Sequence, residues 1–153
     1  MDYQAIINAP FGKLGIRCAE DVLLGVEFLP RGAKVRAPRN ALAQQVCVQL
    51  EAYFADANYR FSLPLELDGT PHQRKVWQAM CAIPRGRTQT YGELAAQIGS
   101  SARAVGQACG NNPVPIIIPC HRVVSAAGLG GFMHRADDAA LDIKRWLLAH
   151  ERR

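Results

Sequence analysis

Residues 112–124 read NPVPIIIPCHRVV and place a thiol beside an imidazole directly after an apolar run. A thiol nucleophile must lose its proton, and a nearby base or positive charge lowers its pKa from about 8.5 toward neutrality. His121 and Arg122 follow Cys120 and could supply both. We therefore expect Cys120 to be a reactive thiol with a lowered pKa. The alternative is that Cys120 is unreactive and packs as a small buried hydrophobic residue, as most free cysteines do.

The composition is typical of a globular chain with one core or two small lobes, because 49% of its 153 residues are hydrophobic. No apolar run approaches the roughly 20 residues that a membrane helix needs. The N-terminus also lacks a basic region followed by an apolar one. We expect a cytoplasmic protein without membrane contact.

Five cysteines are scattered along the chain without a CxxC spacing. This pattern favours reduced thiols and gives no sign of a disulfide framework or a metal site. The cysteines are Cys18, Cys47, Cys81, Cys109 and Cys120.

The net charge of +5 is unevenly distributed, since residues 1–68 carry −1 and residues 69–153 carry +6. A basic second half suits a polyanionic partner, because cations that neutralise phosphates release condensed counterions. A solvated basic surface without a partner is the alternative.

The first half of the chain predicts a small lobe with an antiparallel sheet and one helix. Short apolar bursts between residues 3 and 29, broken by Pro10, Gly12 and Asp21, indicate strands joined by tight turns. Residues 41–54 are apolar at helical spacing after a plausible N-cap, Asn40. Residues 61–67 alternate again, which predicts a further strand. The boundary sequence DGTP at 68–71 ends this lobe, so the first domain is 1–68.

The second half predicts a mainly helical domain, residues 69–153, and the whole chain an α/β (α+β) fold. Helices are expected over 71–82, over about 91–98, over 102–109 and over 139–151. Thr90 and Glu93 form a capping box at the second of these. The second and third helices, joined by a glycine-containing turn, form a helix-turn-helix, a motif often used on DNA.

Three motifs occur in order along the second half: RAVG at 103–106, the block at 112–124, and KRWLLAHE at 144–151. With these motifs the chain resembles the O6-alkylguanine-DNA alkyltransferase family, also called methylated-DNA–protein-cysteine methyltransferases. The resemblance is specific over 83–151 and looser over 50–77 and 10–12. It implies a ribonuclease-H-like N-terminal lobe and a C-terminal DNA-binding and alkyl-acceptor domain.

The resemblance implies DNA repair by direct, irreversible transfer of the methyl group from O6-methylguanine to Cys120, once per protein molecule. The expected partner is double-stranded DNA, bound in the minor groove, with the damaged nucleotide flipped out of the stack. No cofactor, metal or obligate protein partner is implied.

The resemblance also assigns catalytic roles to four residues. Cys120 matches the nucleophile, His121 the base that acts through a water, and Glu151 the carboxylate that orients the histidine. Tyr91 matches the tyrosine that donates a hydrogen bond to the flipped base. Without the resemblance, Glu151 is equally a solvated residue at a helix end and Tyr91 an aromatic residue packed on the core.

Further residues match DNA contacts, the pocket and structural positions. Arg103 corresponds to the arginine that replaces the flipped base, and Asn112 to a hinge residue whose amide ties turn backbone together. Arg122 is expected to be a structural ion-pair or hydrogen-bond donor. The other expected DNA-binding residues are Ala102, Ala104, Gly106 and Gln107, for which tight helix packing is the alternative. The expected pocket residues are Tyr91, Val123, Phe132 and Met133.

The loop at residues 130–140 departs from the family pattern. Phe132 replaces a tyrosine, and bulky residues and several extra ones replace small residues. Backbone donation from Met133 to the guanine oxygen remains plausible, but we expect a narrower pocket that accepts methylguanine and handles benzyl adducts poorly. Arg85 stands where an aromatic residue is common and is expected to add a phosphate contact.

Three other functions compete with alkyl transfer. A pure recognition module for damaged bases lacks the cysteine that this chain has. A cysteine hydrolase using Cys120 and His121 would need a carbonyl substrate and an oxyanion hole. The interpretation as a transcription factor would depend on the helix-turn-helix alone.

Overall fold

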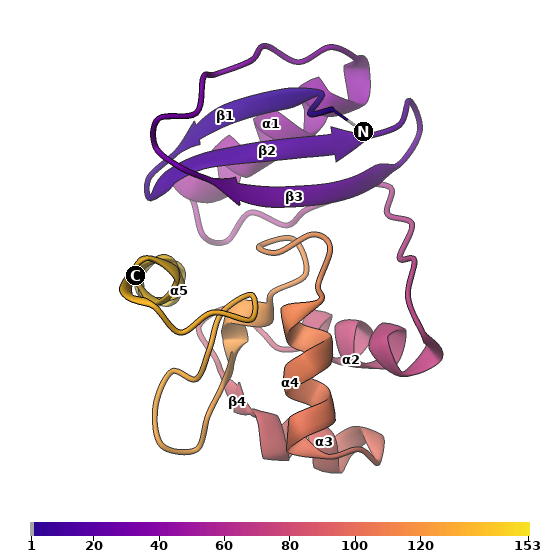
Figure 1. The fold of residues 1–153 in the computed structure, drawn as a ribbon, viewed down its shortest axis with the longest axis vertical. Coiled ribbons are helices and arrows are strands. Elements are labelled where there is room, and N and C mark those ends of the chain that lie inside the picture. Colours follow the sequence, from indigo (N-terminus) through magenta and orange to yellow (C-terminus); the bar gives the residue numbers. More distant parts are fainter. Residues whose placement is uncertain (1) are drawn as a thin grey trace. The chain divides into compact units, whose positions relative to one another are not determined.

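A computed structural model describes residues 2–153. The described chain separates into two compact units, with the division between Leu67 and Asp68. The fold is a mixed α/β structure, as the sequence predicts, with an antiparallel sheet and one helix in the first unit and most helices in the second (Figure 1).

The first unit is a three-stranded antiparallel sheet covered by one helix. The strands β1 (Ala5–Ala9), β2 (Gly12–Cys18) and β3 (Leu23–Leu29) pair in sequence order, with Ile7 opposite Leu14 and Ile16 opposite Val26. Helix α1 (Ala41–Ala55) packs on the sheet (Figure 1), and the Asn40 side chain caps it by accepting from the Ala43 amide at 2.8 Å. Along β2 the buried apolar residues Leu14, Ile16 and Cys18 alternate, because they share the face of the sheet that lines the core.

Residues 61–67 do not form the predicted strand. They make a single bridge, between Leu65 and Leu23, and the Leu23 amide donates to the Pro64 carbonyl at 2.8 Å. The proline nitrogen has no hydrogen to donate, so a continuous ladder cannot pass Pro64. The alternation of this segment predicts its burial pattern but not its hydrogen bonding.

The second unit is built from helices around a small core. Helix α2 (Pro71–Cys81) packs on α3 (Tyr91–Ile98) and α4 (Ala102–Gly110), and α5 (Asp138–Glu151) ends the chain. Between α4 and α5 lie the short 3-10 helix η1 (Cys120–Arg122) and strand β5 (Val123–Val124), which pairs in parallel with β4 (Gln89–Thr90). The buried Trp77 indole N–H donates to the Ala108 carbonyl at 2.9 Å and ties α2 to α4.

Helices α3 and α4 form the predicted helix-turn-helix. Thr90 and Glu93 make the capping box, with the Thr90 hydroxyl accepting from the Glu93 amide at 3.0 Å. Gly99 ends α3 at φ 70°, a left-handed conformation that glycine adopts without a steric penalty. The turn that joins the two helices is therefore specified locally by the sequence.

Among residues 2–153, no helix has both the length and the apolar character needed to span a bilayer.

The capping box can be tested by Thr90→Ala. Loss of the cap should lower the free energy of unfolding by about 0.5–2 kcal/mol, as measured by denaturant titration. Thr88→Ala is the matched control, because Thr88 is exposed and precedes the helix. Equal stability of the two variants would contradict the role of the cap.

Candidate active site

The turn before Cys120 is held by the side chain of Asn112. Its amide nitrogen donates to the Ile118 carbonyl at 2.8 Å, and its oxygen accepts from the Val114 amide at 3.0 Å. Within this turn Ile116 has φ 76°, which is a strained conformation for a β-branched residue. Asn112 thus ties the turn backbone together in the way expected for a hinge residue.

Cys120 begins η1 and is buried, with 5% of its surface exposed. Burial raises the pKa of this thiol to about 11, and the Asn112 side chain and the Lys144 charge offset this only in part. The expectation of a lowered pKa is therefore wrong for the resting protein. His121 and Arg122 do not supply an ionising field, because desolvation of the thiolate outweighs the nearby charges.

His121 is fully buried, and its Nε2 lies 2.9 Å from Oε2 of Glu151. Burial lowers the pKa of the imidazole, although the hydrogen bond and charge of Glu151 act in the opposite direction. The ring is therefore neutral at physiological pH. Its Nδ1 is buried and has no hydrogen-bond partner among residues 2–153, so this nitrogen can accept a proton.

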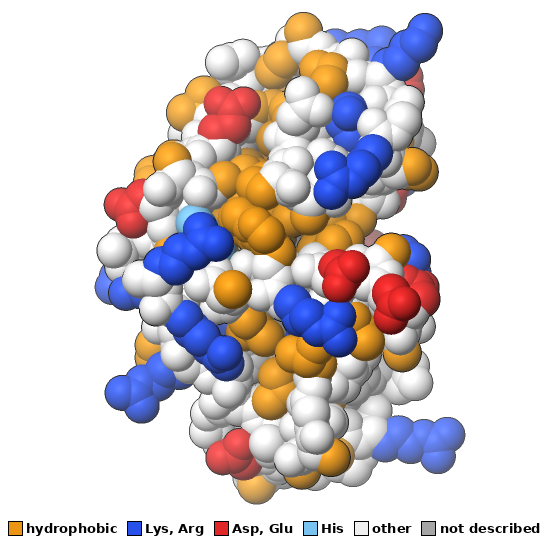
Figure 2. Space-filling model, turned by 90° about the vertical axis from the view of Figure 1, so that its left-hand side faces the viewer, with side chains coloured by type: hydrophobic (Ala, Val, Ile, Leu, Met, Phe, Trp, Pro, Cys, Tyr) orange, Lys and Arg blue, Asp and Glu red, His pale blue; other side chains and the backbone are white. Residues whose placement is uncertain are grey.

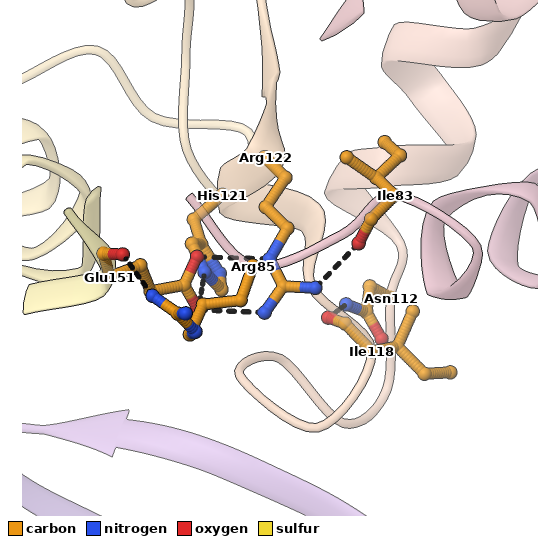
Figure 3. A network of polar contacts seen from close by, with 7 residues as sticks. All are labelled: Ile83, Arg85, Asn112, Ile118, His121, Arg122 and Glu151. Carbon is orange, nitrogen blue, oxygen red and sulfur yellow. Dashed lines mark hydrogen bonds and ion pairs between the residues drawn. The ribbon is translucent and has the colours of Figure 1, made fainter. Parts of the chain in front are cut away.

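Glu151 is buried at the end of α5 and is shared by two basic side chains (Figure 3). The Arg122 guanidinium binds both carboxylate oxygens, with Nε 2.9 Å from Oε1 and Nη2 2.8 Å from Oε2. Its Nη1 donates to the Ile83 carbonyl at 2.7 Å. The expected structural role of Arg122 is confirmed, and the buried charge of Glu151 is compensated by a two-point contact.

Arg85 also contacts Glu151, through the backbone. Its Nη1 donates to the Glu151 carbonyl at 2.8 Å (Figure 3). A Cβ added at the neighbouring Gly86 would lie 3.2 Å from the same carbonyl oxygen. One nitrogen of Arg85 thus stabilises the C-terminal end of α5, where carbonyl groups lack helical partners. The phosphate contact expected of this exposed residue stays a prediction.

Lys144 is a fully buried cation in α5. Its Nζ donates to the carbonyls of Val123, Leu129 and Gly131 at 2.8, 2.6 and 2.8 Å. Burial lowers the pKa of Lys144 to about 8, and nearby thiols act against this. The lysine is the positive group that partly offsets the rise in the Cys120 pKa.

A cavity of about 220 Å³ lies between α3, α4 and the loop before α5. Tyr91 lines it, and burial raises the pKa of its hydroxyl to about 12, so the hydroxyl remains a donor. Phe132 and Met133 line the cavity, whereas Val123 is fully buried, is not among the described lining residues and offers its carbonyl to Lys144. The lining residues are Tyr91, Gly106, Gly110, Gly131, Phe132, Met133 and His134.

The residues expected to meet DNA lie on α4. Arg103 and Gln107 are exposed one helical turn apart, with Ala102 also exposed. Ala104 and Gly106 are half-buried, so these small residues pack against neighbouring residues and are also partly open to solvent. Figure 2 shows Lys and Arg side chains with apolar side chains between them on the face that it draws.

Family models match both units of the chain. Residues 71–153 match the model described as 6-O-methylguanine DNA methyltransferase, DNA binding domain. Residues 3–67 match the ribonuclease-like domain of the same protein family. The chain belongs to the 6-O-methylguanine DNA methyltransferase family.

Relatives of this family resemble the chain over nearly its whole length. A methylated-DNA–protein-cysteine methyltransferase of Mycolicibacterium paratuberculosis is 50% identical over 156 residues, covering 96% of this chain and 90% of the relative. The crystal structure of the O6-methylguanine methyltransferase of Mycobacterium tuberculosis matches with TM-score 0.82 and 36% identity. The match covers 99% of this chain and 92% of that chain. A structure of Mycobacterium tuberculosis OGT in complex with DNA matches with TM-score 0.80 and 38% identity. The match covers 96% of this chain and 91% of that chain.

Sequence analysis did not single out Lys144 as a site residue of this methyltransferase-family chain. A signal existed, because Lys144 shares the buried stripe of α5 with Ala140, Leu147 and Glu151. A lysine on the apolar face of an amphipathic helix needs acceptors in the core. The three carbonyls that bind it come from β5 and from the loop before α5, which no sequence pattern brings together with Lys144.

The resting state of the thiol gives a testable prediction. The ultraviolet absorbance of thiolate, compared between the protein and Cys120→Ser, should show no ionisation of Cys120 at about pH 8, because burial raises its pKa to about 11. An ionisation assigned to Cys120 near neutrality would contradict this account. Cys81→Ser, which removes an exposed thiol, is the control for the method.

Proposed function

We propose that this chain repairs DNA by transferring the methyl group of O6-methylguanine to Cys120. The family supports methyl transfer to a protein cysteine. The observation that carries the proposal is the buried pair of neighbouring residues Cys120 and His121, with Oε2 of Glu151 2.9 Å from Nε2 of the imidazole. Burial shifts both pKa values in the direction that keeps the thiol protonated and the imidazole neutral. All five cysteines are free, as in a protein of the reducing cytoplasm, where we place the reaction.

In the proposed reaction, Nδ1 of His121 takes the thiol proton of Cys120, relayed by a water molecule. Glu151 faces the opposite nitrogen and stabilises the imidazolium that forms. The Lys144 charge stabilises the thiolate, whose interaction with this cation already opposes the burial effect. The thiolate is therefore generated inside the site at the moment of reaction, and no base from solvent is needed.

The sulfur electron pair then attacks the methyl carbon, and the bond between that carbon and guanine O6 breaks. The bond electrons pass to guanine, which gains one proton while the thiol has lost one. The Tyr91 hydroxyl, protonated because its pKa is raised to about 12, donates a hydrogen bond to the base as negative charge develops. The products are unmodified guanine and a stable thioether, so each molecule reacts once.

Access to the methyl group requires the nucleotide to leave the base stack, which costs a few kcal/mol. Helix α4 supports this step, because Arg103 is exposed on it and small residues surround it. We propose that α4 lies in the minor groove and that Arg103 fills the space of the flipped base. The net charge of +6 on residues 69–153 favours the approach to phosphates.

The proposal is tested by incubating the protein with duplex DNA that carries O6-methylguanine and weighing the intact protein and its peptides. We expect the mass of one methyl group on the Cys120 peptide and none in Cys120→Ser. Repeated turnover, or methylation of Cys81 or Cys109 instead, would overturn the proposal.

The role of Arg103 is tested by Arg103→Ala. The rate of transfer from duplex DNA should fall by about tenfold or more, whereas transfer from the free methylated base should not change, because the free base needs no flipping. Arg145→Ala is the matched control, since Arg145 is an exposed arginine on α5 rather than α4, where it pairs with Asp142 of the same helix. Equal loss on both substrates would contradict the assigned role.

A further inference from the structure

Residues 132–135 form a tight hairpin turn with an unusual backbone. Phe132 and Arg135 exchange two backbone hydrogen bonds, at 2.8 and 3.0 Å. The two residues between them, Met133 and His134, have φ 53° and 63°. Two-residue turns with positive φ at both positions normally use asparagine and glycine. Two bulky side chains in this conformation are strained, and such strain persists only where surrounding contacts hold it.

Contacts on both sides hold this turn in place. Before it, Lys144 binds the carbonyls of Leu129 and Gly131. After it, the Arg135 guanidinium binds both oxygens of Asp137 at 2.7 and 2.8 Å. Asp137 in turn caps α5 by accepting from the Ala140 amide at 3.0 Å. These contacts therefore hold the turn in place as part of the cavity wall.

His134 is fixed by its side chain as well. Its Nε2 lies 2.8 Å from Oδ1 of Asn111, at the end of α4. Its ring packs against Gly110 so closely that a Cβ added there would lie 2.3 Å from the ring. His134 thus connects the loop to α4 on one side of the cavity. His134 and Gly110 both line this cavity.

Met133 contacts both the cavity and the nucleophile. It lines the cavity, and its Sδ lies 3.8 Å from Sγ of Cys120. Cys120 itself is not among the described residues that line the cavity. A group that approaches the sulfur from the cavity along this contact packs against the Met133 thioether.

We propose that the Met133–His134 turn restricts the transferred group to about the size of methyl. This inference rests on the proposed function and adds the class of adduct. The flexible methionine side chain can shift enough to admit a methyl group. A benzyl group needs the space that the fixed turn backbone and the His134 ring occupy, so O6-benzylguanine reacts slowly.

The test compares single-turnover rates on duplex DNA containing O6-methylguanine or O6-benzylguanine, for the wild-type protein and for Met133→Gly/His134→Gly. Glycine adopts positive φ without strain, so the variant keeps the turn while both side chains are removed. We expect the ratio of benzyl to methyl rates to rise by about tenfold or more.

Ala136→Gly is the matched control, because it adds a glycine to the same loop at an exposed position that does not line the cavity. It should leave the ratio unchanged. The inference is overturned if wild-type protein transfers benzyl as fast as methyl, or if the double variant keeps the wild-type ratio. Failure of wild-type protein to transfer methyl at all would instead overturn the proposed function, and this inference with it.

Discussion

The site depends on one buried carboxylate. Glu151 is 1% exposed and lies between the Arg122 guanidinium and the His121 ring, while Arg85 binds its backbone carbonyl. An unpaired buried charge costs several kcal/mol, so these contacts must form together. They bring the end of α5, the 3-10 helix η1 and residues 83–86 to one point, and thereby fix the orientation of the His121 ring.

This arrangement keeps the thiol and the imidazole neutral until a substrate arrives. Burial raises the pKa of Cys120 and lowers that of His121, so the proton stays on sulfur in the resting protein. A permanently ionised thiolate would be exposed to oxidation and to other electrophiles. In the proposed single-turnover reaction, a thiol that stays protonated is protected until it reacts. Lys144 would then stabilise the thiolate, and Glu151 the imidazolium.

Local signals in the sequence predicted much of this structure. Asn40, the Thr90 and Glu93 pair and Gly99 act within a few residues, so the limits of α1 and α3 could be predicted from them. Cys120 and His121 are adjacent, and their pairing with Glu151 followed from the family resemblance. The direction of the Cys120 pKa shift could not be predicted, because it depends on burial by distant segments. The failed strand at 61–67 and the contact of Arg85 with Glu151 likewise depend on tertiary partners.

The central claim is that His121, oriented by Glu151, deprotonates a neutral Cys120. The single-turnover rate of methyl transfer against pH tests it in wild-type protein, Glu151→Gln and the exposed control Asp142→Asn. We predict a wild-type rate that is flat near neutral pH and falls on the acid side as His121 becomes protonated. It should also fall above about pH 8, where Lys144 loses the charge that stabilises the thiolate. Glu151→Gln should lower the plateau by about a hundredfold, and Asp142→Asn should not. A rate that rises steadily toward the thiol pKa of about 11 and is unchanged in Glu151→Gln would contradict the account.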